Sequence, residues 1–188
     1  ELMVGFMIGA QPFCGSRERV YAIYPNLSSD QEVSVTTTAC KRGFVSRWAF
    51  AVGLGMVFGC SKDAIFVTSG GAEEVISQDI EGLFRGKTVN GYPPIDFSVN
   101  SDCRGIRLEI HQDNLYFLYP GTDGCRYVLV YSLLYKWWIS SWRFDAMPVW
   151  KRLIAASVTS PSVRYSGLPQ MVSIREALSP ELRPAMIR

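Results

Sequence analysis

The chain has 188 residues, of which 48% are hydrophobic and 19% are charged, a balance typical of a folded protein rather than a disordered one. Its formal net charge of +2 is too small to predict a nucleic-acid-binding surface from charge alone. No apolar run reaches the roughly 18 residues of a membrane-spanning helix, so we expect no membrane span. The sequence begins inside an apolar run, Glu1-Leu2-Met3-Val4, and we expect it to be a fragment of a longer chain.

Cysteine and histidine usage predicts neither a metal site nor a bound cofactor. His111 is the only histidine, and no cysteine lies at the paired spacing of a zinc site. The five cysteines are widely separated, at Cys14, Cys40, Cys60, Cys103 and Cys125. We therefore expect free thiols in a reducing compartment rather than a disulfide framework.

The first part of the chain predicts short strands joined by polar turns. Leu2–Ile8, Gln11–Cys14 and Val20–Tyr24 fit two or three strands, with a charged bend before the last of them. Glu32–Thr38 (EVSVTTT) alternates with period two and predicts a further strand, with Val33 and Val35 on the same side.

The segment from residue 44 to residue 76 predicts a group of four strands. The expected strands are Phe44–Phe50, Leu54–Cys60, Ala64–Thr68 and Glu73–Ile76, separated by turn-forming residues. A short helix is expected over Ser77–Phe84, with Ser77 as its N-cap and acidic residues in its first turn. A long loop then covers residues 85–100.

The clearest pattern in the chain is a four-stranded antiparallel meander within Gly105–Phe144. The expected strands are Gly105–Ile110, Leu115–Tyr119, Cys125–Tyr131 and Trp137–Phe144, each rich in β-branched and aromatic residues. Such a meander is the unit from which β-propeller blades are built.

These groups predict an all-β fold of antiparallel four-stranded meanders that resembles part of a β-propeller. Residues 1–158 form the blades, with blade-like units at 44–76 and 104–144, and residues 159–188 form further strands or an extended tail. The two units suggest an internal repeat in which the turns at Asp63 and Asp113 correspond. A β-sandwich is the alternative, because its strands have similar spacing. Short turns within each group favour the propeller.

The carboxylates and the histidine do not predict an enzyme. Glu73 and Glu74 point to opposite faces if they lie on a strand, and Asp79 and Glu81 do not share a helix face, so none of these forms a glycosidase pair. His111 lies in a turn, and the chain has no Gly-x-Ser-x-Gly nucleophile motif. We expect structural roles for these side chains.

Three tryptophans on the last predicted strand are the candidate interaction residues. On a regular strand Trp138 and Trp142 share one face, while Trp137 lies on the other. A pair of tryptophans on one face could stack on sugars or on bases. We favour the other interpretation, in which they pack between neighbouring sheets.

Several of these segments resemble the β-propeller tail-tube, nozzle and head-to-tail connector proteins of short-tailed bacteriophages, including those called stabilisation proteins. The resembling segments are Phe6–Cys14, Arg19–Tyr24, Gly55–Phe58 (GMVF), Ser61–Val67 (SKDAIFV), Val75–Phe84 (VISQDIEGLF), Val128–Ser132 (VLVYS) and Lys136–Trp138 (KWW). The chain departs from the family pattern at Ala64, where the family has Gly, and at Ser132, where it has Asp.

The resemblance implies a virion structural protein without catalytic residues. Copies of it would form a ring with one another and contact other tail or portal proteins at the portal vertex. The ring would form part of the channel through which DNA is ejected, or would plug it, after assembly in the host cytoplasm. Two alternatives are a carbohydrate-binding or depolymerase propeller module and a general protein–protein interaction propeller.

Overall fold

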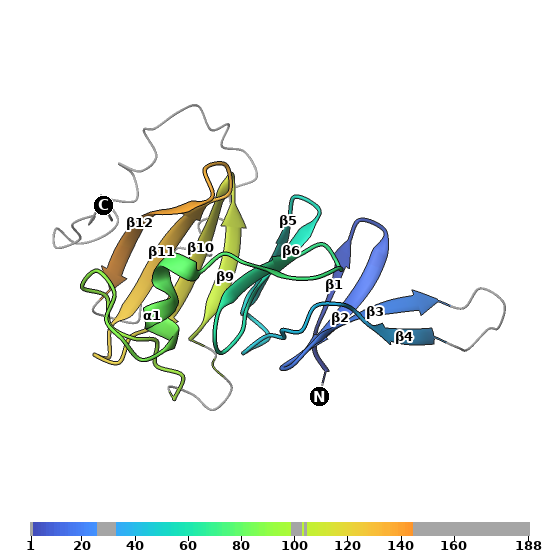
Figure 1. Ribbon diagram of the computed structural model, residues 1–188, viewed down its shortest axis with the longest axis horizontal. Helices are drawn as coiled ribbons and strands as arrows, with labels where there is room; N and C mark the ends of the chain where they lie inside the picture. Colours follow the sequence, from blue (N-terminus) through green and yellow to red (C-terminus); the bar gives the residue numbers. More distant parts are fainter. Residues whose placement is uncertain (1, 26–32, 99–102, 104, 145–188) are drawn as a thin grey trace, which may run out of the picture.

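The computed structural model describes residues 2–25, 33–98, 103 and 105–144. Within them the protein consists of three antiparallel four-stranded sheets and one short helix (Figure 1). The predicted all-β fold of four-stranded meanders is therefore confirmed. The predictions for residues 145–158 and 159–188 lie outside the described part. No described helix is long and apolar enough to cross a membrane.

The first sheet is a complete four-stranded meander with the order β1-β2-β3-β4. Its strands are β1 (Leu2–Ile8), β2 (Gln11–Ser16), β3 (Val20–Pro25) and β4 (Val33–Thr37). The sequence indicated these strands individually, but it did not single them out as a unit like the other two. The described residues thus contain three four-stranded units, of which two were named from the sequence.

The second sheet has the order β5-β6-β7-β8, and one of its predicted strands is wrong. Its strands are β5 (Phe50–Gly53), β6 (Met56–Cys60), β7 (Ile65–Thr68) and β8 (Glu74–Val75). The first hairpin turns at Leu54 and Gly55, which both have positive φ (54° and 70°), as a tight hairpin requires. The strand expected over Phe44–Phe50 therefore begins only at its last residue. Phe44 and Val45 are buried in the connection between sheets, which explains their strand-like character.

The short helix is present, and Ser77 occupies the N-cap position at its start as predicted, but not as a side-chain cap. It consists of a 3₁₀ turn, η1 (Gln78–Ile80), followed by α1 (Glu81–Phe84). Ser77 makes no side-chain capping bond. Its hydroxyl oxygen instead accepts a hydrogen bond from the Ile65 backbone N–H at 2.9 Å, so it ties the segment before the helix to strand β7.

The third sheet contains the meander predicted within Gly105–Phe144, with the order β9-β10-β11-β12. Its strands are β9 (Arg107–His111), β10 (Asn114–Pro120), β11 (Arg126–Ser132) and β12 (Trp137–Phe144). Every strand pairs with the next along the chain. The predicted strand pattern is confirmed here, with ends shifted by a few residues.

The proposed correspondence between Asp63 and Asp113 is wrong. Asp63 lies in the second turn of its sheet, between β6 and β7, whereas Asp113 lies in the first turn of its sheet, between β9 and β10. The topological counterpart of Asp63 is Asp123, between β10 and β11. Both carboxylates accept hydrogen bonds from their own turn or strand, Asp63 from Ser61 and Asp123 from Tyr127.

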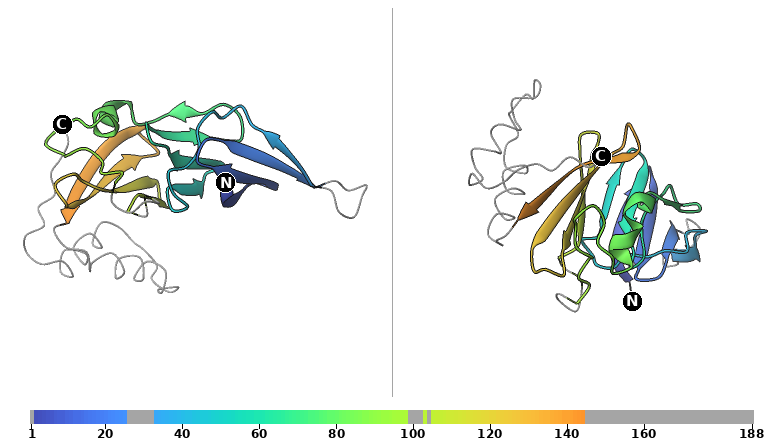
Figure 2. Two further views of the ribbon diagram at one scale, coloured as in Figure 1. Left: turned by 90° about the horizontal axis from the view of Figure 1, so that it is seen from below. Right: turned by 60° about the vertical axis from the view of Figure 1, so that its left-hand side comes forward.

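The three sheets pack in chain order with their first strands in contact. Strand β1 contacts β5, and β5 contacts β9, while the later strands of each sheet fan outward (Figures 1 and 2). One buried cluster joins the first two sheets and another joins the last two. This is the arrangement of neighbouring propeller blades. A Greek-key sandwich would exchange strands between its sheets, and none of the described strands is exchanged in this way.

Close approach of the first two sheets depends on glycine. A Cβ atom at Gly15 would lie 2.2 Å from the Phe44 ring, and one at Gly59 would lie 2.6 Å from it. The space is filled by Phe44, whose ring centroid lies 5.7 Å from those of Phe50 and Phe66 and 5.9 Å from that of Phe6. Aromatic pairs at these separations stabilise a core beyond the area that they bury.

Candidate functional site

The tryptophans of β12 do not lie as a regular strand predicts. In the β11–β12 pairing, Trp142 lies opposite Val128 and Trp138 lies opposite Tyr131. The register shifts between Val130 and Tyr131. The extra residue in β12 is Ile139, and such a β-bulge reverses the alternation of side chains. Trp138 and Trp142 therefore lie on opposite faces of the sheet, and the prediction of a shared face is wrong.

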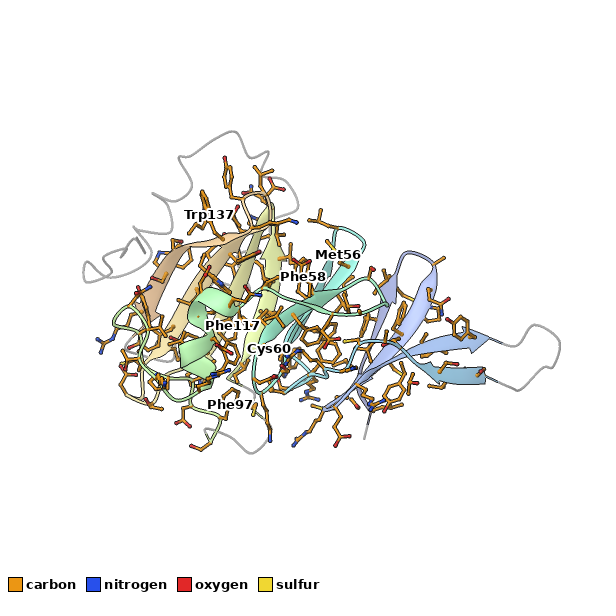
Figure 3. The ribbon with its side chains drawn as sticks, in the orientation of Figure 1. Met56, Phe58, Cys60, Phe97, Phe117 and Trp137 are labelled. Atoms are coloured by element: carbon orange, nitrogen blue, oxygen red, sulfur yellow. The ribbon has the colours of Figure 1, made fainter. Side chains whose placement is uncertain are left out.

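Trp138 is a packing residue between the second and third sheets. It is only 7% exposed and contacts Tyr131 and Phe117 edge-to-face, with ring centroids 5.2 Å and 6.5 Å away. Its indole N–H donates a hydrogen bond to the Ile76 carbonyl oxygen at 3.2 Å. Phe117 and Phe58, both labelled in Figure 3, belong to the same buried cluster, which joins the second and third sheets.

The other two tryptophans have separate environments. Trp142 stacks on Tyr116, with centroids 6.2 Å apart and rings inclined by 7°, on the face of the third sheet that points away from the second. Trp137 is 57% exposed and stacks on Tyr135 at 5.6 Å. Because Trp138 is buried and Trp142 lies on the other face, the two do not form a platform for a sugar or a base.

An exposed aromatic side chain that sequence reasoning missed is Trp48, just before β5. The guanidinium carbons of Arg47 and Arg107 lie 5.2 Å and 5.0 Å from its ring centroid, within the range of cation–π attraction. The Trp48 carbonyl also accepts a hydrogen bond from the Leu108 N–H at 3.1 Å. The Arg47-Trp48 pair was visible in the sequence, but only the packing of β5 on β9 brings Arg107 to it.

The described part contains a polar cavity of about 360 Å³ between the β6–β7 turn and the short helix. Its charged side chains largely neutralise one another: Arg42 pairs with Asp63, and Arg85 pairs with Glu81 at 2.6 Å. Lys62 adds a further positive charge to the lining. The charged groups that line the cavity are thus mostly engaged in ion pairs with one another.

The carboxylates considered as catalytic candidates are distributed over strand β8 with the residue before it, the 3₁₀ turn and the short helix. Glu73 accepts a hydrogen bond from the Lys41 backbone N–H at 2.9 Å, and it lies 3.7 Å from Arg42. Glu74 is part of β8, while Asp79 belongs to the 3₁₀ turn. Glu73 therefore fixes the connection between the first two sheets, in keeping with a structural role.

Histidine and cysteine side chains do not gather into a site. His111 lies at the end of β9 beside the turn that contains Asp113. No disulfide joins the five cysteines, all of which lie in the described part. Cys60 is fully buried, and burial raises the pKa of its thiol. Across the described ranges, no group of three or more His, Cys, Asp or Glu side chains could hold a metal ion.

No protein-family model and no curated protein matches this chain. The resemblance to phage propeller proteins therefore rests on the sequence segments given above. The fold shows in addition which side chains are buried and which are exposed, and the exposed ones are those that can contact a partner.

The Arg42–Asp63 pair predicts a small acid-dependent loss of stability. Burial raises the pKa of Asp63, but hydrogen bonds from Arg42 and Ser61 outweigh it, so the pKa lies below the ordinary 3.8. The carboxylate thus stabilises the fold above pH 3.8, and this contribution is lost as the pH falls through its lower folded-state pKa. Because Asp63 is mostly exposed, we expect Asp63→Asn to cost below about 1 kcal/mol.

Urea unfolding from pH 7 down to the acid limb would measure this effect. The difference in free energy of unfolding between the wild type and Asp63→Asn should be constant near neutral pH and should vanish in acid. Asp113→Asn, an exposed aspartate in the β9–β10 turn, is the matched control and should leave the curve unchanged. A difference that grows as the pH falls would contradict the assigned role.

Proposed function

We propose that this protein is a structural subunit of a bacteriophage tail or portal-vertex complex, of the nozzle or connector kind. Copies of the chain associate with one another and with other virion proteins, and the assembly encloses or plugs the path of the DNA. The sequence segments that resemble such proteins span all three described sheets, from Phe6 in β1 to Trp138 in β12.

The observation that supports an assembly role most strongly is an exposed apolar set at one end of the molecule. The β1–β2, β5–β6 and β11–β12 hairpins all point to the same side (Figure 1). Their exposed hydrophobic residues are Met7, Val52, Leu54, Leu134, Tyr135 and Trp137, here called the hairpin face. Scattered apolar residues are normal on a surface, but a concentration on one side is typical of a protein–protein contact.

The low net charge fits a subunit that DNA passes without being held. Affinity for the DNA backbone grows with each phosphate that a lysine or arginine neutralises. A chain with 19 basic and 17 acidic residues offers little such excess. The hairpin face also favours a second candidate function, a protein–protein interaction propeller outside a virion.

Imaging of the purified protein and of phage particles tests this proposal. We expect rings by electron microscopy, and an antibody against the protein should label one vertex of the particles that carry it. Leu54→Lys combined with Leu134→Lys should break the rings into smaller species with an unchanged circular dichroism spectrum. Thr122→Lys, at an exposed turn between β10 and β11, is the control and should form rings as wild type does.

Two results would argue against the proposal in different ways. A wild-type protein that remains a free monomer at every concentration would exclude the assembly role altogether. Rings that no antibody locates on a phage particle would instead favour the second candidate, an interaction protein outside the virion.

A further inference from the structure

Strand β4 is an open sheet edge. It is the last strand of the first sheet, and among the described strands it pairs with β3 alone. All five of its residues are exposed, including Val33 at 60% and Val35 at 54%. Figures 1 and 2 show β3 and β4 extending away from the other two sheets, so that no described element lies along the outer edge of β4.

The outermost strands of the other two sheets carry features that discourage further pairing, and β4 carries none of them. Strand β8 has only two residues, one of which is Glu74. Strand β12 contains the bulge at Ile139 and carries Arg143 near its end. Short length, charge and bulges are the means by which sheet edges avoid association. Strand β4 (VSVTT) is uncharged, unbroken and rich in β-branched residues, which favour sheet formation.

The hydrogen-bonding groups that face the free edge can be assigned from the β3 pairing. The Thr38 backbone N–H donates to the Val20 carbonyl at 3.2 Å. Because bonded and non-bonded pairs alternate along an antiparallel ladder, the N–H and C=O groups of Val33, Val35 and Thr37 point outward. These groups lie on an exposed strand and can form a second ladder.

We infer that strand β4 binds strand β4 of a second copy of this chain, antiparallel and across a two-fold axis at Val35. In this register Val35 lies opposite the partner's Val35, and Val33 lies opposite the partner's Thr37. Each of these residues has outward backbone groups, so every outward N–H meets an outward C=O. The other face brings Ser34 opposite the partner's Thr36.

The side chains of β4 are compatible with those of a second β4 strand. Every cross-strand pair in this register joins valine, threonine or serine side chains, so no like charges oppose each other, and β-branched pairs stabilise antiparallel sheets. Two four-stranded sheets would become one continuous sheet of eight strands. This contact goes beyond the proposed function, since it requires a second copy but no virion.

A two-fold contact has a specific effect on assembly. It closes on itself and pairs two units, whereas a ring needs a separate head-to-tail surface. Loss of the β4 contact should therefore halve the mass of the assembled particle, whether the units that it joins are single chains or rings. This twofold change separates the β4 contact from the hairpin face, whose loss would dissolve the ring itself.

Mass photometry or sedimentation of Val35 variants tests the inference. Val35→Lys places two like charges opposite each other, and Val35→Pro removes an N–H that faces outward, away from β3. Both variants should halve the particle mass while retaining the wild-type circular dichroism spectrum. Thr122→Lys, at an exposed position of the β10–β11 turn outside both β4 and the hairpin face, is the control and should leave the particle mass unchanged.

A mixing experiment identifies the occupant of the edge. Val35→Lys and Val35→Glu should each fail to pair alone, but a mixture of the two should recover the wild-type mass, because opposite charges then meet across the axis. Recovery supports a second copy as the partner. An unchanged mass in the single variants, no recovery on mixing, or a wild type that never pairs would overturn the inference.

Discussion

Replacement of Trp138 by alanine is expected to lower the free energy of unfolding by about 3–5 kcal/mol, the usual cost of removing a large buried aromatic side chain. The indole fills the space between the second and third sheets, against Phe117 and Tyr131. Its loss also leaves the Ile76 carbonyl without the hydrogen bond from the indole. Urea unfolding followed by far-ultraviolet circular dichroism would measure the change without relying on tryptophan fluorescence.

Two further variants separate the contributions of volume and hydrogen bonding at this position. Trp138→Phe retains an aromatic ring but cannot donate a hydrogen bond to Ile76. Its loss in free energy of unfolding should be smaller than that of Trp138→Ala and larger than the roughly 1 kcal/mol of one hydrogen bond. Trp137→Ala, at the exposed neighbour, should cost about 0.5 kcal/mol, as is usual on a surface. Equal losses for Trp137→Ala and Trp138→Ala would contradict the assignment of Trp138 to the core between the sheets.

Gly43→Ala is expected to destabilise the protein by about 3 kcal/mol, at the upper end of the usual cost of overpacking. A Cβ atom there would lie 2.4 Å from backbone atoms of Ser16, Arg17 and Glu18. A flexible side chain could move away, but these atoms belong to the β2–β3 turn, which is fixed to the same connection by the Phe44–Ser16 backbone hydrogen bond at 2.9 Å. The substitution must therefore displace the first sheet from the connection to the second.

Gly71→Ala provides the control, because an added Cβ atom at that position meets nothing within 4 Å. Thermal unfolding of both variants should show a clear loss of melting temperature for Gly43→Ala and little change for Gly71→Ala. If Gly43→Ala were as stable as Gly71→Ala, the connection could not be packed against the β2–β3 turn as described.

These two sites show how the assembly surfaces are held in place. The hairpin face is spread over three sheets, and its geometry depends on the interfaces that Trp138 and the connection through Gly43 stabilise. A change in either interface should therefore weaken assembly together with stability. Substitutions on the hairpin face or on β4 should change assembly alone.

Much of the secondary structure could be predicted because it depends on local patterns. The strands of the third sheet follow from β-branched and aromatic runs between turn formers, and strand β4 follows from its period-two alternation, although both of its valines are exposed. The error at Phe44–Phe50 arose because an apolar connection buried between sheets has the same composition as a strand. Periodicity cannot distinguish these two cases.

The candidate site was less predictable because it depends on contacts between distant residues. The bulge at Ile139 has no clear local signal, yet it sends Trp138 and Trp142 to opposite faces. Similarly, Arg107 reaches Trp48 only because β5 packs on β9. The hydroxyl of Ser77 was available for a helix cap, but it accepts a hydrogen bond from the Ile65 N–H of strand β7 instead.

The sequence by itself therefore determined the fold class, two of the three described four-stranded units and most strand positions, because turn chemistry and side-chain alternation act between neighbours along the chain. Tertiary structure alone decided which face each tryptophan occupies, which carboxylates are paired, and which edge remains open. Those features depend on register and on packing between sheets, and a single inserted residue in a strand is enough to reverse them.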